Sequence, residues 1–402
     1  MTGAAAGTGG SPRAARLATF AYFTLAGFLL GMWIVHIPPI EHRTGIDHAV
    51  LGRVLLLLGA GAVVGMRVAG PLTDRAGARR VVPLSAAAAG AAVVLPGLAT
   101  GAWTLGAALL LLGAAHGALD VAMNAHAVQV ERGYGRPVMA AFHAAFSLGG
   151  VLAALAGART LTWGWSPAAT LGMVAILSTA AGAAAAPALL RSGGTPDAAA
   201  PPARRRTPRR IRGLAVLAFM IMLCEGVAND WSVLHLRDLG ASPGTAALAF
   251  GAFSAAMTGG RLLADRLAAR FGPVAVLRNG TALAAAGLTV AALSPWAAPA
   301  LAGWAVLGAG LSGAVPQLFS AAGHHDRESS GANVSRVAGL GYLGMLAGPA
   351  VIGPLTRVVP LGLTLFLPVA LCVVAAAAAR LVRPGPGAGA GLRTGRETEV
   401  SA

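Results

Sequence analysis

The sequence has no lysine and little charge of any kind. Acidic and basic residues make up 11% of its 402 positions, whereas soluble proteins carry roughly a quarter. Hydrophobic residues reach 56%, and the mean hydropathy is +0.70. This composition excludes a soluble globular protein and predicts a chain that lies in a lipid bilayer.

The residues that are missing also exclude particular kinds of site. The phosphate-binding sequence G-x-x-x-x-G-K-[S/T] requires a lysine, so an ATP-driven pump is not expected. The two cysteines, Cys224 and Cys372, lie inside apolar segments and read as small core residues. They support neither a disulfide framework nor a metal cluster. We therefore expect no metal and no cofactor other than a coupling ion.

Long hydrophobic runs are abundant. About twelve of them reach roughly 20 residues, which is enough to cross a hydrocarbon core about 30 Å thick. Backbone groups in lipid must be hydrogen-bonded within the segment, so the runs are expected to be helices and the protein to be all-α. The predicted spans are 16–37, 48–69, 80–99, 103–127, 138–158, 167–190, 212–235, 244–262, 273–293, 297–319, 334–356 and 361–381.

The 30 basic residues, all arginine, give a formal net charge of +16, and they are unevenly distributed over the loops. One set of alternate loops and tails contains Arg13, Arg16, Arg75, Arg79, Arg80, Arg132, Arg136, Arg204, Arg205, Arg206, Arg209, Arg210, Arg212, Arg266, Arg270, Arg380 and Arg383. The other set contains only Arg43, Arg159, Arg237 and Arg357. Such asymmetry sets membrane orientation, so the arginine-rich side and both termini are predicted to be cytoplasmic. No nucleic-acid partner is expected.

A segment rich in Pro, Ala and Arg divides the chain into two halves. We expect residues 191–211 to be a cytoplasmic linker between helical bundles at 18–190 and 212–383. The flanking tails, 1–17 and 384–402, are short of large apolar residues. Segments of this kind cannot bury enough apolar surface to fold, so the linker and both tails are predicted to be disordered.

A short motif occurs once in each half. GPLTDRAGARR runs from Gly70 to Arg80 after one apolar span, and GGRLLADRLAARFG runs from Gly259 to Gly272 after another. The glycines at positions 77 and 272 differ by 195, and so do those at 149 and 344 in AFSLG and LGYLG. Duplicated halves in a long apolar chain are typical of transporters built from internal repeats.

The first motif carries a family resemblance. Its residues match the loop signature G-x-L-x-D-R-x-G-x-R-R of the major facilitator superfamily at Gly70, Leu72, Asp74, Arg75, Gly77, Arg79 and Arg80. The segments HGALDVAMNAH, FHAAFSLGG and CEGVANDWSVLHLRD resemble the bacterial, sugar-permease-related branch that includes fucose permease-like members. The resemblance implies twelve transmembrane helices in two pseudo-symmetric six-helix bundles, in a bacterial cytoplasmic membrane.

The same resemblance implies a conformational role for the motif. By analogy, Asp74 and Arg75 bias the conformational equilibrium, and Asp265 with Arg266 is the degraded second copy. Asp74 is expected to cap the third helix and pair with an arginine of the opposite bundle. Arg75, Arg79 and Arg80 are expected to meet lipid phosphates or helix C-termini. The alternative is that these charges serve topology alone.

Three acids fall inside predicted spans, where a charge is costly and usually functional: Asp120, Glu225 and Asp230. His116, Asp120 and Asn124 are spaced four apart, so they share a helix face. Counted from the cytoplasmic end of its predicted span, Asp120 is about 10 Å deep, and His143 on the fifth helix has a similar depth. Asp120 is predicted to bind the coupling proton, with His143 or His116 as partner. The alternative is a hydrogen bond that only packs helices.

Other polar residues are candidates to line a substrate cavity. Glu225 and Asn229 share a face of the seventh helix, next to Asp230, and Asn124, Gln317 and Tyr342 could add donors. Trp33 or Trp231 could stack on a sugar ring, although Trp231 could instead be an interfacial anchor. His36 is expected at the membrane interface. Pro316 and Pro349 could bend the tenth and eleventh helices, either for gating or only structurally.

The function indicated is secondary active, proton-coupled transport of a small polar solute, for which a sugar is one candidate, by alternating access. The partners expected are membrane lipids and the small-molecule substrate, and the protein is expected to be a monomer. The alternatives are an exporter of drugs or metabolites by proton antiport and, more distantly, a non-transporting sensor. The fifth predicted helix lacks the Gly-Pro pair of an antiporter signature, which argues against the exporter. A membrane-embedded enzyme is not expected, since His324 to Asp326 is the single compact group of catalytic residue types.

Overall fold

The computed structural model describes residues 11–134, 138–190, 208–323, 325 and 330–383. Twelve helical segments among these residues are long and apolar enough to cross a membrane. The first six are built from α1 (Pro12–Thr44), α2 (His48–Ala76), α3 (Ala78–Ala92) with α4 (Val94–Leu98), α5 (Ala102–Tyr134), α6 (Met139–Thr162), and α7 (Pro167–Ala185) with the 3₁₀ turn η1 (Ala186–Ala188). The other six are built from α8 (Arg209–Asp238), α9 (Pro243–Phe271), α10 (Pro273–Leu293), α11 (Ala297–Leu311) with α12 (Ala314–Gly323), α13 (Ser330–Leu355), and α14 (Leu361–Thr364) with α15 (Phe366–Ala377) and η2 (Ala378–Val382).

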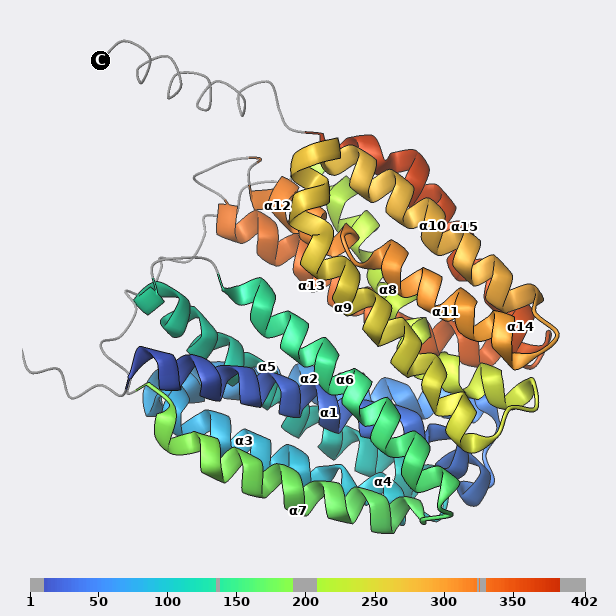
Figure 1. The fold of residues 1–402 in the computed structure, drawn as a ribbon, viewed down its shortest axis with the longest axis horizontal. Helices are drawn as coiled ribbons and strands as arrows, with labels where there is room; N and C mark the ends of the chain where they lie inside the picture. The colour runs from blue at the N-terminus through green and yellow to red at the C-terminus, as the bar shows by residue number, and fades with distance from the viewer. Residues whose placement is uncertain (1–10, 135–137, 191–207, 324, 326–329, 384–402) are drawn as a thin grey trace, which may run out of the picture.

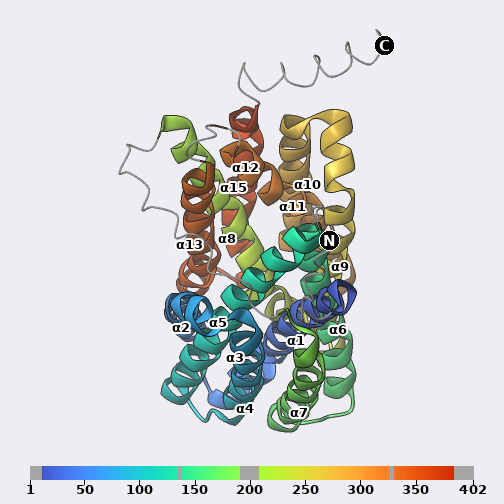
Figure 2. The same ribbon diagram turned by 90° about the vertical axis from the view of Figure 1, so that its left-hand side faces the viewer.

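The helices form two bundles that lie side by side, α1 to α7 in one and α8 to α15 in the other (Figures 1 and 2). The two bundles repeat each other closely. Helix α2 begins at position 48 and α9 at 243, while α5 begins at 102 and α11 at 297, so both pairs differ by 195. The duplication predicted from the motifs is therefore confirmed by the helix boundaries.

Two ends of the molecule are named here by their turns. At the Gly45 end, α1 joins α2 and α8 joins α9, each through a glycine with positive φ, 65° at Gly45 and 79° at Gly240. At the Gly77 end, Gly77 and Gly272 link α2 to α3 and α9 to α10 with φ values of 83° and 81°. The described chain begins and ends at the Gly77 end, as an even number of spans requires (Figure 1).

The first predicted span, 16–37, is too short at both ends. Helix α1 begins at Pro12 and continues through Pro38 and Pro39 to Thr44, where the Gly45 N–H bonds back to the carbonyls of Glu41 and His42. Proline lacks an N–H, but the consecutive pair did not end the helix. Helix α8 similarly begins at Arg209, before the expected 212.

The predicted tails and linker fall mostly outside the described residues. Residues 1–10, 191–207 and 384–402 are not described, and the predicted disorder there stays a prediction. Residues 12–17, assigned to the first tail, are helical.

Proline has different effects in the tenth and eleventh spans. The tenth is broken between α11 and α12 at Ser312 and Gly313, and Pro316, four residues after Ser312, has no N–H to bond that carbonyl. In the eleventh, α13 continues through Pro349 to Leu355. A break in the tenth span is therefore explained by its proline.

Small residues allow close approach of the helices. A Cβ on Gly113 of α5 would overlap the carbonyl oxygen of Leu58 on α2. Between the bundles, a Cβ on Gly52 of α2 would lie 2.5 Å from the Pro349 oxygen and 2.8 Å from the Gly353 Cα of α13. Such packing is typical of helices in lipid, where dispersion and shape replace the hydrophobic drive. The Gly52 contact places the bundles in backbone contact near the Gly45 end.

Candidate functional site

One arginine connects the two bundles at mid-depth. The Arg261 guanidinium on α9 donates from Nη1 to the Ser147 hydroxyl on α6 at 2.9 Å, and from Nη2 to Glu225 Oε1 on α8 at 3.2 Å. The side chains of Arg261 and Glu225 are 25% and 15% exposed. Ser147, Glu225 and Arg261 are called the Arg261 cluster below.

The depth of this cluster follows from helix lengths. Glu225 is sixteen residues from the start of α8 and thirteen from its end, so it lies about 24 Å from one end and about 20 Å from the other. Arg261 was not among the predicted site residues. The sequence signal that could have identified it is a lone arginine inside the predicted span 244–262. Placing its charge in the membrane is as costly as placing the charges of the three selected acids there.

The predicted polar stripe on α5 is present. The Asn124 amide donates to the Asp120 backbone oxygen at 2.8 Å and to its carboxylate Oδ1 at 3.1 Å. The Tyr342 phenol of α13 interacts electrostatically with both Asp120 and Glu225. These interactions place the two acids, which come from different bundles, near a common residue at the junction between the bundles.

Among the described residues, no hydrogen bond or ion pair joins Asp120 to its predicted partners His143 and His116. The His143 ring lies edge-on to Phe23 at 5.3 Å and interacts electrostatically with Arg261. The His116 ring lies 6.4 Å from Phe146, and its Nδ1 is buried without a hydrogen-bond partner. Among the described residues, Asn124 is the hydrogen-bond partner of the Asp120 carboxylate.

The estimated depth of Asp120 also changes. Helix α5 runs to Tyr134, seven residues past the predicted span, so Asp120 lies about 21 Å from that end and not about 10 Å. His116 is level with Phe146, so Asp120 and His143 each lie about one turn further toward the Gly77 end. Their expected similarity in depth holds although they are not bonded.

The other cavity candidates differ in exposure. Asn229 and Asp230 are half-buried, and Tyr342 is 45% exposed. Trp33 is fully buried and Gln317 is 8% exposed, so neither presents a free surface in this conformation.

Trp231 and His36 both lie inside the protein, although an interfacial position was expected for His36 and was one of two alternatives for Trp231. Trp231 is fully buried with its ring 5.8 Å from the His48 ring. His36 is fully buried, and its Nδ1 bonds the Met32 carbonyl oxygen at 2.8 Å. His36 lies away from the helix end because α1 continues two turns beyond it to Thr44.

The latch residues Gly70, Asp74, Arg75, Gly77, Arg79, Arg80, Asp265 and Arg266 lie at the Gly77 end. Asp74 does not cap the third helix. Helix α2 continues to Ala76, so the N-cap residue of α3 is Gly77. Asp74 and Arg75 are exposed and have no ion pair within the described residues. The side chain of Asp265 lies outside the described residues, and Arg266 is exposed.

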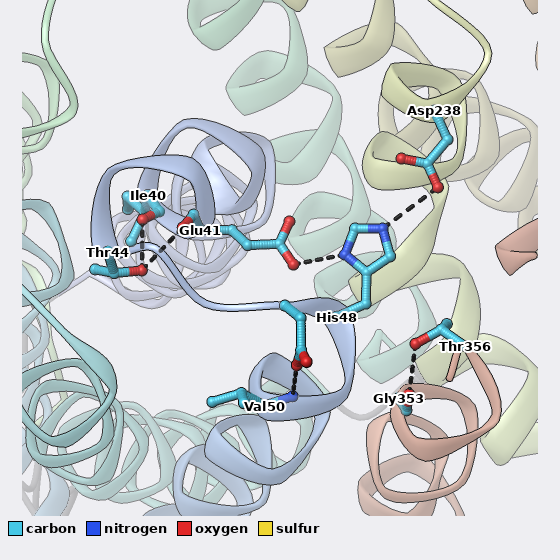
Figure 3. Close-up of polar contacts among 9 residues, drawn as sticks. Ile40, Glu41, Thr44, His48, Val50, Asp238, Gly353 and Thr356 are labelled. Carbon is cyan, nitrogen blue, oxygen red and sulfur yellow. Dashed lines mark hydrogen bonds and ion pairs between the residues drawn. The ribbon is translucent and has the colours of Figure 1, made fainter. Parts of the chain in front are cut away.

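A second group of charges at the Gly45 end was missed altogether. His48, the first residue of α2, bonds Glu41 of α1 through Nδ1 at 2.5 Å and Asp238 of α8 through Nε2 at 3.3 Å (Figure 3). Asp47 lies 3.9 Å from Arg357. A hollow of about 510 Å³ lies beside them, lined by Glu41, His42, Ile46, Asp47, His48, Ala49, Thr356 and Arg357. Glu41, His48 and Asp238 are called the His48 cluster.

Neither group resembles a metal centre. Within the part of the chain that the structure describes, no group of three His, Cys, Asp or Glu side chains is arranged to hold a metal ion. Cys224 and Cys372 are free and buried, with their sulfur atoms 3.7 Å apart, a proximity that the sequence did not indicate. Of the His324 to Asp326 group, only His325 is described.

Comparison with known proteins identifies the family. The family model of the Major Facilitator Superfamily matches residues 17–236. An uncharacterised MFS-type transporter of Yersinia pestis is 34% identical over 367 residues, covering 90% of this chain and 94% of the relative.

Solved structures share the fold. A point mutant of the nucleoside transporter NupG superposes with a TM-score of 0.72 at 14% identity, covering 91% of this chain and 99% of the NupG chain. The MFS transporter FucP, in its outward conformation, gives 0.65 at 14% identity, covering 92% and 98%. With twelve apolar helices in two bundles among the described residues, these matches show that the chain belongs to the Major Facilitator Superfamily and is a multi-pass membrane transporter, not an enzyme.

Proposed function

We propose that the protein is a proton-coupled secondary transporter that moves a small polar solute by alternating access between its two bundles. The observation that carries this proposal is the Arg261 cluster, a charged connection between the bundles at mid-depth. Transporters of this architecture bind substrate near the midplane at the interface between repeats. A charge is retained at such depth only where it is paired or wet and functional.

The two mid-depth acids have complementary surroundings. Glu225 has the Arg261 guanidinium beside it, whereas the Asp120 carboxylate is bonded to a neutral amide. Among the described residues, Asp120 therefore has no bonded cation, and exchanging a proton there relieves an unbalanced charge. This supports Asp120 as the proton carrier, and Glu225 with Arg261 as groups that can bond polar atoms of a solute.

The contacts between bundles support a state closed at the Gly45 end. Gly52 packs on Gly353, His48 bonds Asp238, and Phe250 of α9 lies against Gly31 and Gly150 of the other bundle. The exposed Asp74 at the Gly77 end is consistent with separation there.

The arginine distribution supports a cytoplasmic location for the Gly77 end, in a bacterial plasma membrane. Its described arginines include Arg13, Arg16, Arg75, Arg79, Arg80, Arg266, Arg270, Arg380 and Arg383, against Arg43, Arg53, Arg159, Arg237 and Arg357 at the other end. The structure would then be inward-facing, with both termini in the cytoplasm. Lipids would contact its outer surface, and one chain would contain the complete pathway.

The test is uptake into proteoliposomes that contain the full-length protein, with an imposed proton gradient. The panel would contain labelled sugars, nucleosides, amino acids and cationic dyes. Once a solute is found, Asp120→Asn should abolish uphill accumulation but preserve exchange of labelled for unlabelled solute, because exchange requires no net proton movement. Accumulation that is unchanged by Asp120→Asn would refute the proton role.

Glu131→Gln is the matched control. It removes a carboxylate from the same helix, but Glu131 lies near the helix end, where it bonds the backbone N–H groups of Val138 and Met139. The glutamine oxygen can still accept such bonds. Uptake should therefore be retained, and its loss would mean that α5 acids act through folding and not through proton binding.

A further inference from the structure

The His48 cluster joins the two bundles by a titratable group. Glu41 and His48 belong to the first bundle, at the end of α1 and the start of α2, and Asp238 belongs to the second, at the end of α8. Figure 3 shows the imidazole between the two carboxylates, with one ring nitrogen toward each. The ring nitrogens lie 2.5 Å from Glu41 Oε1 and 3.3 Å from Asp238 Oδ2.

This geometry fixes the proton count of the cluster. A neutral imidazole carries one N–H and an ionised carboxylate only accepts, so two ionised acids can both be bonded only by the doubly protonated ring. If one acid carries the proton instead, the total is the same. The bridged arrangement therefore holds one proton more than a neutral histidine between two ionised acids.

The surroundings of the cluster keep the extra charge compensated. Glu41 interacts electrostatically with Asp47 and Asp238 as well as with His48. Other charged or titratable groups at this end bond elsewhere or lie at its edge. Arg43 bonds the Pro96 oxygen, Arg237 bonds the Ala241 oxygen, Arg357 lies by Asp47, His42 lines the hollow, and Arg53 is exposed on α2. His235 accepts a hydrogen bond from the Trp304 indole and also interacts electrostatically with Asp238. Negative charge thus predominates around His48, which favours the imidazolium.

The His48 cluster is reached by water on one side and packed against the protein on the other. The hollow of about 510 Å³ reaches Glu41 and His48, so water can exchange protons with the cluster. On its inner side the fully buried Trp231 ring lies against the His48 ring. Next to it, Gly52 and Gly353 bring α2 and α13 into backbone contact.

We infer that Glu41, His48 and Asp238 form a proton-binding site that closes the Gly45 end when His48 bridges the two bundles. Separation of the bundles there removes Asp238 from His48, so the open form binds that proton less tightly. By linkage, acid on this side favours the closed form, and alkali favours opening. The identity of this side as external rests on the proposed function, whereas the linkage itself does not.

The test measures the opening of the Gly45 end directly. Spin labels would be placed at Thr100 of the first bundle and Val358 of the second, both exposed, in full-length protein whose buried Cys224 and Cys372 are replaced by alanine. Pulsed EPR distances in lipid nanodiscs would be recorded from pH 5 to 9. The ratio of closed to open molecules should fall with rising pH, by up to about tenfold per pH unit for one linked proton.

The variants separate this site from other titrating groups. His48→Gln should remove the pH dependence, and Asp238→Asn, which leaves His48 in place, should weaken it and favour the open form. His42→Gln, the same change on an exposed histidine of the same hollow, should leave the profile unaltered. An unaltered profile in both His48→Gln and Asp238→Asn, or its loss in His42→Gln, would overturn the inference.

The outcome is independent of the solute and of Asp120. If Asp120→Asn accumulates solute normally but the EPR profile is as expected, the proposed proton carrier is wrong and the His48 site stands. In proteoliposomes, changing the pH on one side only distinguishes an external from a cytoplasmic Gly45 end. A profile that follows the internal pH would reject the proposed orientation but not the linkage.

Discussion

The Arg261 cluster and the His48 cluster both join the bundles through a cation between polar partners, but the cations differ in kind. Arginine does not lose its proton in proteins, so Arg261 can be released only by a change in Glu225, Ser147 or a bound solute. Histidine can lose its proton, so the His48 bridge can be released by deprotonation. The comparison indicates that the centre responds to what is bound and the Gly45 end responds to pH.

The largest effect is expected from removing the permanent cation. Arg261→Met leaves Glu225 at mid-depth without its partner, and breaking a buried ion pair costs up to about 3–5 kcal/mol. Uptake should fall by about 100-fold or more, and the thermal unfolding temperature should also fall. Adding Glu225→Gln should recover the unfolding temperature but not the uptake.

The control for this change is Arg278→Met, on an exposed position of α10. It should leave both uptake and unfolding nearly unchanged. If Arg261→Met is as stable and active as the native chain, the mid-depth pair is not a working part of the transporter and the comparison fails.

The next largest effect concerns the packing beside the His48 cluster. Gly52→Val places methyl groups where a Cβ would already lie 2.8 Å from the Gly353 Cα, so α2 and α13 must separate. Overpacking costs about 1–3 kcal/mol, which should shift the EPR distribution toward the open form about tenfold. Gly172→Val on α7, where a Cβ would have no neighbour within 4 Å, should not shift it. Equal shifts in both variants would show that the seal does not depend on this contact.

A third change makes the Gly45 end resemble the centre. His48→Arg replaces the titratable cation by a permanent one that can still bond Glu41 and Asp238. The closed form should then persist from pH 5 to 9, and uptake should slow several-fold because the end opens less often. A variant that still opens with rising pH would assign the response to another group.

The smallest effect is expected for the exposed pair next to the cluster. Asp47 and Arg357 are 3.9 Å apart with side chains 61% and 56% exposed, and exposed pairs contribute about 1 kcal/mol or less. Asp47 also caps α2 by accepting from the Val50 N–H, a role that asparagine fills equally well. Asp47→Asn should therefore change the closed fraction by less than about fivefold, and high salt should remove the difference.

Much of the fold followed from patterns in the sequence. The 195-residue offset of Gly77 and Gly272 predicted the duplication. The apolar runs located the twelve spans found among the described residues, because an apolar segment in lipid must form its backbone hydrogen bonds internally and therefore folds as a helix. Helix ends were less predictable. The first span was predicted to end at position 37, but its helix continues through Pro38 and Pro39 to Thr44.

The candidate site was predicted only in part. Asp120 and Glu225 were selected by the cost of a buried charge, which applies equally to Arg261, although Arg261 was not among the predicted site residues. Pairing of Asp120 with His143 could not be judged from depth alone, since the rotation of α5 against α6 decides which side chains meet. His48 and Asp238 are 190 positions apart and sit at helix ends, where charged residues are ordinary. Only the packing of the bundles brings them together.

The turns at Gly77 and Gly272 have a mechanical consequence. Each turn is a single residue between two long helices, so the two helices cannot move independently along their axes. A slide of α2 by one residue, about 1.5 Å, must be passed on to α3, and the same holds for α9 and α10. Reorientation of the transporter is then expected to carry each six-helix half as one stiff body, with the adjustment concentrated where the halves touch.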